Sequence, residues 1–106
     1  MSINKKTIEL ATCIKNTEEF RKMNENKASL DKNKTIKKKL DNYLLKKKNI
    51  YSNFSLEEAS KKISVLNEEY KDFFHTPIIS EYIKSTKNFN DLMENIYKTI
   101  EKELIK

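Results

Sequence analysis

The stretch that decides the fold runs from Ser55 to Phe73 and has the sequence SLEEASKKISVLNEEYKDF. Ser55 and Glu58 form a capping box, a pairing typical of the first turn of a helix. The apolar residues after it step by three and four positions: Leu56, Ala59, Ile63, Leu66, Tyr70 and Phe73. This spacing puts them on one face of a helix that packs along another helix. We therefore expect a helix that starts at Leu56 and ends near His75.

The segment before this helix has the same spacing, with one charged interruption at Lys47. Its apolar residues are Ile36, Leu40, Tyr43, Ile50 and Phe54. Polar residues bound the segment on both sides, at 31–33 and at 52–55. We expect a third helix here, with a seam that faces the fourth helix.

Two shorter helices are expected over residues 4–31. Asn4 is the expected N-cap of the first, whose apolar residues fall on one side. Asn16 and Glu19 have the spacing of a capping box and predict the start of the second, which runs to about Asp31.

Thr76 and Pro77 predict the start of the fifth helix, because proline is favoured at the first helical position. Its central apolar row is Ile79, Tyr82, Thr86, Phe89, Met93, Ile96 and Ile100. Flanking rows add Ile78, Ile83, Leu92, Tyr97 and Leu104. About 28 residues extend roughly 42 Å, more than the diameter of a compact domain of this size. We therefore expect this helix to protrude and to carry apolar surface that one chain cannot cover.

These elements predict an all-α protein of five helices, in one domain over residues 1–106. Residues 4–31 supply two short helices, and residues 33–106 form a long antiparallel helical hairpin region that we expect dimerisation to complete. The chain has no glycine, 37% hydrophobic residues and 36% charged residues. Nucleotide-binding loops need glycine, so this composition argues against nucleotide enzymes, and we assign no catalytic residue. The expected oligomer interface consists of Leu56, Ile63, Leu66, Tyr70, Phe73, Ile79, Tyr82, Phe89, Met93 and Ile96.

The single cysteine, Cys13, excludes an intramolecular disulfide and fits a reducing compartment. Its position beside Leu10 and Ile14 predicts a small buried side chain. His75 is expected at a helix end or in solvent, and no metal or cofactor site is expected. The chain has no signal-peptide pattern and no apolar run of 18 residues, so we expect a cytoplasmic protein without membrane insertion.

The net charge of +6 is concentrated in the third helix. The basic residues that could meet a partner there are Lys37, Lys38, Lys39, Lys46, Lys47 and Lys48. At about 100° per residue they surround the helix instead of forming one row, which favours a solvated face. Binding of RNA or of an acidic partner through these lysines is the alternative interpretation.

Three stretches carry a resemblance to a known family: Ile8–Phe20, His75–Tyr82 and Phe89–Met93. Their order and spacing resemble those of the YlbF/YmcA/YheA family of small helical bacterial proteins. The resemblance implies a non-enzymatic regulator of competence, sporulation and biofilm formation that influences messenger RNA processing by RNase Y.

The same resemblance implies particular partners. These are further copies of the chain in a dimer or larger homo-oligomer, paralogues from the family, and a YaaT-like protein. The related complex carries iron–sulfur clusters on cysteines. One cysteine cannot ligate a cluster alone, so the chain departs from that pattern.

Overall fold

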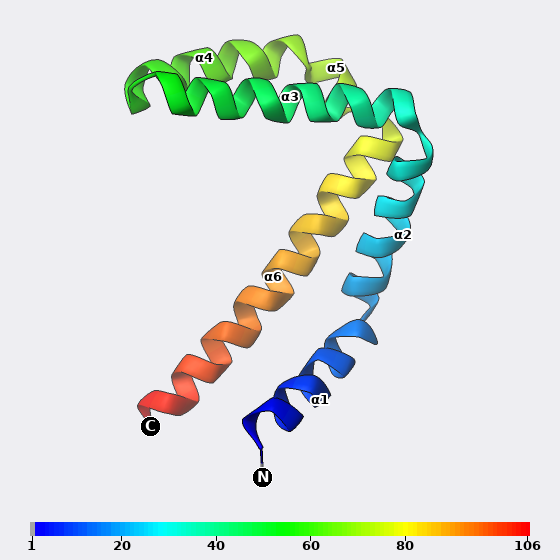
Figure 1. Cartoon of the computed structure of the whole chain (residues 1–106), viewed down its shortest axis with the longest axis vertical. Helices are drawn as coiled ribbons and strands as arrows, with labels where there is room; N and C mark the ends of the chain where they lie inside the picture. Colours follow the sequence, from blue (N-terminus) through cyan, green and yellow to red (C-terminus); the bar gives the residue numbers. More distant parts are fainter. Residues whose placement is uncertain (1) are drawn as a thin grey trace. The chain divides into compact units, whose positions relative to one another are not determined.

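The computed structural model describes residues 2–106, which form six α-helices joined by short turns (Figure 1). The helices are α1 (Ile3–Lys15), α2 (Glu18–Lys32), α3 (Lys34–Asn53), α4 (Leu56–Glu69), α5 (Lys71–Phe74) and α6 (Pro77–Ile105). No strand occurs within these residues, so the prediction of an all-α protein is confirmed.

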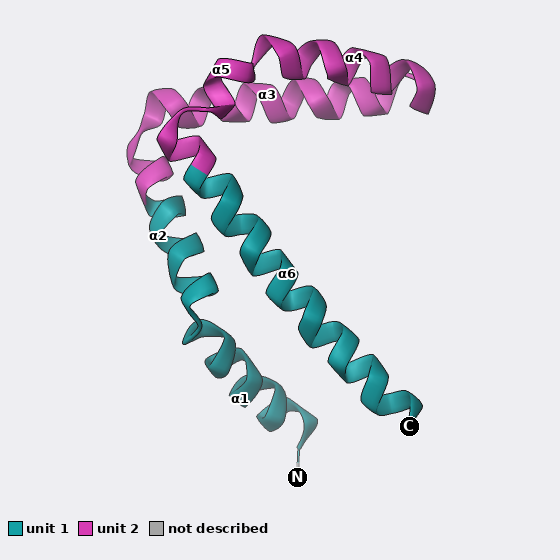
Figure 2. Ribbon diagram, turned by 180° about the vertical axis from the view of Figure 1, so that it is seen from behind, with its two compact units in different colours: residues 1–28, 81–106 teal, residues 29–80 magenta. Residues whose placement is uncertain are grey.

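The chain divides into two compact units, coloured separately in Figure 2. Unit 2 is the continuous segment Ser29–Ser80, which contains α3, α4 and α5. Unit 1 combines the N-terminal segment up to Ala28 with Glu81–Lys106. The single domain over residues 1–106 and the dimer-completed hairpin region over residues 33–106 stay predictions.

The prediction of five helices is wrong, because the chain leaves helical geometry at Tyr70. This residue has φ −98° and ψ 8°, and it separates α4 from the one-turn helix α5. The Tyr70 ring lies 5.1 Å from the ring of Tyr43, centroid to centroid, and Phe74 of α5 lies 4.7 Å from the same ring. With the break, the ring of Tyr70 between the two helices and the ring of Phe74 in α5 both pack against Tyr43 of α3.

Half of the buried apolar side chains of unit 2 lie in α3 and α4, which run side by side (Figure 1). The others are Leu30, Tyr70, Phe73 and Ile79. Both helices contribute buried apolar side chains: Leu40, Tyr43, Ala59 and Leu66. All four belong to the apolar rows expected from the sequence. The Tyr43 hydroxyl also donates a hydrogen bond to Asn67 Oδ1, 2.5 Å away, and so ties α3 to α4.

In unit 1, single side-chain contacts join α2 to α6. The rings of Phe20 in α2 and Phe89 in α6 lie 5.7 Å apart, and the Asn26 side-chain amide donates to the Glu81 carbonyl oxygen at 3.1 Å. Ser85 of α6 is buried, whereas α1 has no buried residue. The packing of α1 and α2 along α6 therefore leaves much apolar surface in contact with water.

Hydrogen bonds at the helix starts confirm two predicted boundaries and supply one that the sequence did not suggest. The Ser55 hydroxyl accepts from the Glu58 N–H at 3.3 Å, as predicted, and α6 begins at Pro77. Asn33, which we had assigned only to a polar break, accepts from the Ile36 N–H at 3.2 Å and caps α3.

Two predicted caps are wrong. Ser2, not Asn4, caps α1, because its hydroxyl accepts from the Lys5 N–H. Asn16 does not start α2, since its own N–H is bound to carbonyl oxygens at the end of α1. The next hydroxyl, on Thr17, accepts from the Phe20 N–H at 3.2 Å and caps α2 instead.

Replacing the cap of α4 tests how the α3–α4 pair begins. We expect Ser55→Ala to lower the free energy of unfolding by about 1 kcal/mol, because one N–H in the first turn loses its partner. Ser60→Ala is the matched control: the Ser60 hydroxyl donates to the Leu56 carbonyl oxygen within the helix, and its loss should change stability by less than about 0.5 kcal/mol. Urea unfolding at one protein concentration measures both. Equal effects of the two substitutions would contradict the assigned cap.

The Tyr43 hydroxyl gives a second test, which depends on pH. Burial raises the pKa of Tyr43 above its usual value, so the unfolded chain ionises first as pH rises past about 10. The contribution of the neutral Tyr43 side chain to the free energy of unfolding is therefore complete below about pH 10 and is lost as the pH rises above it. We expect Tyr43→Phe to cost about 1 kcal/mol at neutral pH and to reduce the loss of stability at high pH. The control is Tyr51→Phe at an exposed position, and an equal response of both variants would refute the role of Tyr43.

Candidate interaction surfaces

The residues expected at an oligomer interface differ in how far the chain itself covers them. Four are buried within the chain: Leu66, Tyr70, Phe73 and Ile79. Five are half-buried: Ile63, Tyr82, Phe89, Met93 and Ile96. Leu56 is 78% exposed. The interface stays a prediction, and the residues open to a partner are those of the second and third groups.

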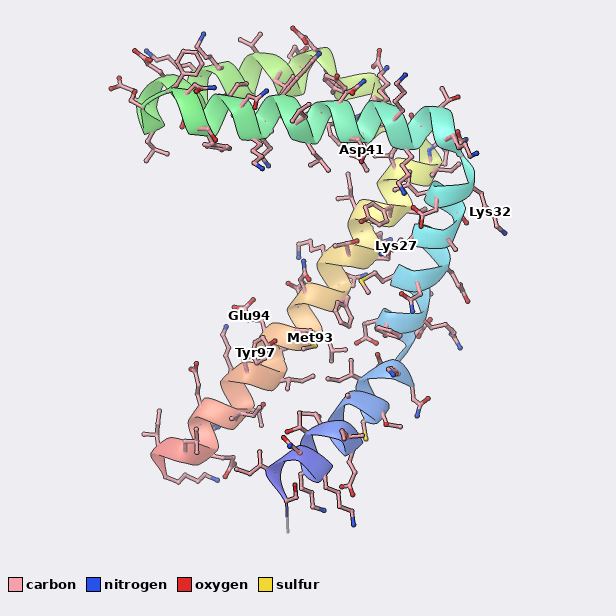
Figure 3. All side chains as sticks on the ribbon, viewed as in Figure 1. Lys27, Lys32, Asp41, Met93, Glu94 and Tyr97 are labelled. Atoms are coloured by element: carbon pink, nitrogen blue, oxygen red, sulfur yellow. The ribbon has the colours of Figure 1, made fainter. Side chains whose placement is uncertain are left out.

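A second apolar row on α6 shares Met93 and Ile100 with the predicted central row, and its other members are more exposed than the rest of that row. Its residues step by three and four positions, and we define the α6 row as Ile83, Met93, Tyr97, Ile100 and Leu104, with Thr86 and Asn90 at the intervening steps. The exposed fractions are 44% for Ile83, 58% for Tyr97 and 79% for Leu104. Figure 3 labels Met93, Glu94 and Tyr97 along this part of the helix.

The sequence analysis assigned Ile83, Tyr97 and Leu104 of the α6 row to a flank of the central apolar row. A sequence pattern does indicate this row. It has the same alternation of three and four steps as the central row, but it starts at Ile83, one position after Tyr82. Two adjacent rows give α6 an apolar face that is too wide for one partner helix.

The predicted basic residues of α3 do not form a row of free charges. Lys39 Nζ lies 5.1 Å from the ring centroid of Phe73, and Lys46 Nζ lies 5.4 Å from that of Tyr70. Such contacts hold an ammonium group over an aromatic face. Lys46 Nζ also donates to the Tyr70 hydroxyl at 3.3 Å.

The other lysines of this set differ among themselves. Lys37 Nζ lies 2.9 Å from Asp31 Oδ1, and the hydrogen bond and charge of that carboxylate raise the pKa of Lys37. Lys47 is half-buried within the seam, whereas Lys38 and Lys48 are exposed. The lysines thus surround α3, as the sequence predicts, and three of them bind groups of their own chain.

An open groove of about 540 Å³ lies along one side of the α3–α4 pair. We call it the α3–α4 groove. From α3 it is lined by Lys46, Asn49, Ile50 and, just beyond the helix, Phe54; from α4 it is lined by Lys62, Val65, Leu66 and Glu69. Val65 is 63% exposed although it is apolar. A groove of this size with apolar walls and polar edges is suited to the side chains of an amphipathic helix.

A polar pocket of about 400 Å³ lies between α2 and α6 in unit 1. Its acidic residues include Glu18 and Asp91, which pair with Lys22 at 3.1 Å and Lys87 at 2.9 Å. Within residues 2–106 there is no group of three or more His, Cys, Asp or Glu side chains that could hold a metal ion. Two of the three acidic residues that line the pocket are therefore paired with lysines, and the third is Glu19.

Cys13 is exposed on α1, so the prediction that it is buried is wrong. The reason is that α1 has no buried residue, and a position beside Leu10 gives no cover. His75 lies at the end of α5, where its Nδ1 is 2.7 Å from the Lys71 carbonyl oxygen. This contact requires the proton on Nδ1 and confirms the expected helix-end position.

No helix among the described residues is both long enough and apolar enough to cross a membrane. The longest, α6, has charged residues along its whole length, among them Lys84, Glu94 and Lys102.

Comparison with known proteins identifies the family. A family model described as control of competence regulator ComK, YlbF/YmcA, matches residues 3–105 of this chain. No curated protein and no solved structure gives a significant match. Because the match covers all six helices, the chain belongs to the YlbF/YmcA family of competence regulators.

Proposed function

We propose that the protein is a non-enzymatic cytoplasmic regulator that acts by presenting helix surfaces to protein partners, among them a second copy of itself. The observation that carries this proposal is the α6 row, in which Tyr97 and Leu104 are more than half exposed. Contiguous apolar patches are rare on soluble monomers and mark sites of association. A row with three and four steps is the geometry by which one helix packs along another.

The regulatory role is supported by the family, whose description names control of the competence regulator ComK. We propose further that the chain is an adaptor that influences messenger RNA processing by RNase Y, as its resemblance to characterised regulators implies. In this role its partners are paralogues of the same family and a YaaT-like protein. The α6 row and the α3–α4 groove support an adaptor, because both have the dimensions of helix-binding surfaces.

One observation favours RNA binding as a second candidate function. The sequence of α3, KTIKKKLDNYLLKKKNIYSN, opposes its lysines with Asp41 alone. Charge of this kind attracts phosphate, and tyrosine rings can stack on bases. However, Lys37, Lys39 and Lys46 bind Asp31, Phe73 and Tyr70, and Tyr43 is buried. We therefore place RNA binding second.

Self-association can be measured as mass in solution. One chain has a mass of 12.6 kDa, and we expect light scattering after gel filtration to give at least twice this value at tens of micromolar. Tyr97→Asp should return the protein to the monomer, because it places a charge within the apolar contact. Asn88→Asp is the matched control, since Asn88 lies about 180° around the helix from Tyr97.

The control should keep the oligomer, and circular dichroism should show equal helix content for all three proteins. A monomeric mass for the unmodified chain at these concentrations would refute self-association. Dissociation by Asn88→Asp as well would show that the α6 row is not the contact.

RNA binding is tested with a labelled single-stranded oligonucleotide over a series of salt concentrations. We expect no oligonucleotide binding that depends on the lysines of α3. Replacing these lysines with glutamine should therefore leave the measured binding unchanged. The substituted residues are Lys37, Lys38, Lys39, Lys46, Lys47 and Lys48. The control replaces Lys84, Lys98 and Lys102 of α6. Binding that falls steeply with salt and is lost only in the α3 variant would establish the second candidate function.

A further inference from the structure

We propose that the α3–α4 groove receives the α6 row of a second copy of the chain. The inference rests on the self-association proposed above and specifies which surface meets which. It follows from the chemistry of the groove, the charges beside the α6 row and the lengths of the two surfaces.

The groove has apolar surface that its own chain leaves open. Ile50 is half-buried and Leu66 is buried, while Phe54 is 41% exposed and Val65 is 63% exposed. Covering the exposed walls removes apolar area from water, which contributes roughly 25 cal/mol for each Å². The occupant must therefore bring apolar side chains.

The two helices that form the groove each place a lysine at its edge, Lys46 from α3 and Lys62 from α4. Lys62 Nζ lies 4.5 Å from the ring centroid of Phe54, directly beside the groove. Within residues 2–106 neither lysine forms an ion pair, and Glu69 is the only acidic residue that lines the groove. An occupant with acidic residues beside its apolar row suits these edges.

The C-terminal half of α6 has this pattern. At about 100° per residue, Glu101 lies roughly 40° and Glu94 roughly 60° around the helix from Tyr97, both on the same flank of the α6 row. Glu94 pairs with Lys98 at 3.0 Å, but both side chains are more than 60% exposed, so the pair is weak and can exchange. Glu101 forms no ion pair among the described residues.

The lengths of the two surfaces also agree. The α4 wall of the groove, from Lys62 to Glu69, spans seven residue steps, as does the α6 row from Tyr97 to Leu104. Each corresponds to about 10.5 Å, or two helical turns. By contrast, an antiparallel pair of two α6 helices centred on this stretch brings Glu101 of each copy close to Glu101 of the other, which is unfavourable.

A contact of two helical turns is small for a stable complex, but a twofold dimer makes it twice. Each copy then inserts its α6 row into the groove of the other, as the reciprocal contact of a C2 dimer requires. The two contacts add toward the roughly 1,200–2,000 Å² of surface that a specific interface buries.

Cross-linking of mixed single variants tests the proposal. Cys13→Ser first removes the exposed native thiol. Val65→Cys is then made in one preparation and Tyr97→Cys in a second that carries a different tag, and the mixture is treated with a short bismaleimide. We expect the main product to join the two tags. Leu45→Cys replaces Val65→Cys in the control, because Leu45 is 57% exposed on α3 but does not line the groove, and this mixture should give at least about tenfold less product.

The outcomes separate the two proposals. If Tyr97→Cys links mainly to itself while the mass is that of a dimer, the groove assignment is overturned and self-association stands. Equal products with Val65→Cys and Leu45→Cys also overturn it. If the mass is that of a monomer and no product forms, self-association itself fails.

Charge reversal gives an independent readout. We expect Lys46→Glu with Lys62→Glu to raise the dimer dissociation constant about tenfold, and adding Glu94→Lys with Glu101→Lys to restore it. No weakening by the first pair, or no rescue by the second, would overturn the charge pairing on which the proposal rests.

Discussion

A shortage of apolar side chains governs how this protein is built. The chain has 37% hydrophobic residues, and half of the buried apolar side chains among residues 2–106 lie in the seam between α3 and α4. The ring of Tyr43 is the centre of that seam, because it contacts both Tyr70 and Phe74 and its hydroxyl binds Asn67. The helices of unit 1 are held by isolated contacts, and the α6 row keeps much of its apolar surface in water. Contact between copies is the most direct way to cover that surface.

The lysine content follows from the same shortage. Lys39, Lys46 and Lys62 extend over the rings of Phe73, Tyr70 and Phe54, and their stems shield aromatic surface while the ammonium groups stay hydrated. The lysines that suggest nucleic-acid binding in the sequence therefore serve, in this fold, partly to shield aromatic side chains from water. Two of these lysines, Lys46 and Lys62, also place positive charge beside the α3–α4 groove, where an acidic helix can meet it.

Much of the fold could be predicted from local patterns. The spacing of the α4 seam and the position of Pro77 specified a helix face and a helix start, because both depend on neighbours within a few residues. The break at Tyr70 could not be predicted, since the apolar spacing continues through it to Phe73 without a gap. That break accompanies ring packing against Tyr43, a contact made across 27 positions of sequence.

The exposure of individual side chains was harder to predict, for a related reason. The sequence shows two adjacent apolar rows on α6, but which of them is covered depends on how α1 and α2 pack along it. In unit 1 the polar residue Ser85 is buried, whereas the aromatic residue Tyr97 is exposed. No pattern within α6 indicates that the polar side chain is the covered one. The exposure of Cys13 was missed likewise, because α1 carries an apolar side without burying it.

Hydrogen–deuterium exchange measured at several protein concentrations tests most directly whether the core is completed between copies. If α6 packs against a second copy, the amides of residues 93–105 should exchange more slowly as the concentration rises from the low micromolar to tens of micromolar. The amides of α1, which lies outside the proposed contact, should not change. Exchange along α6 that is the same at every concentration would contradict the account.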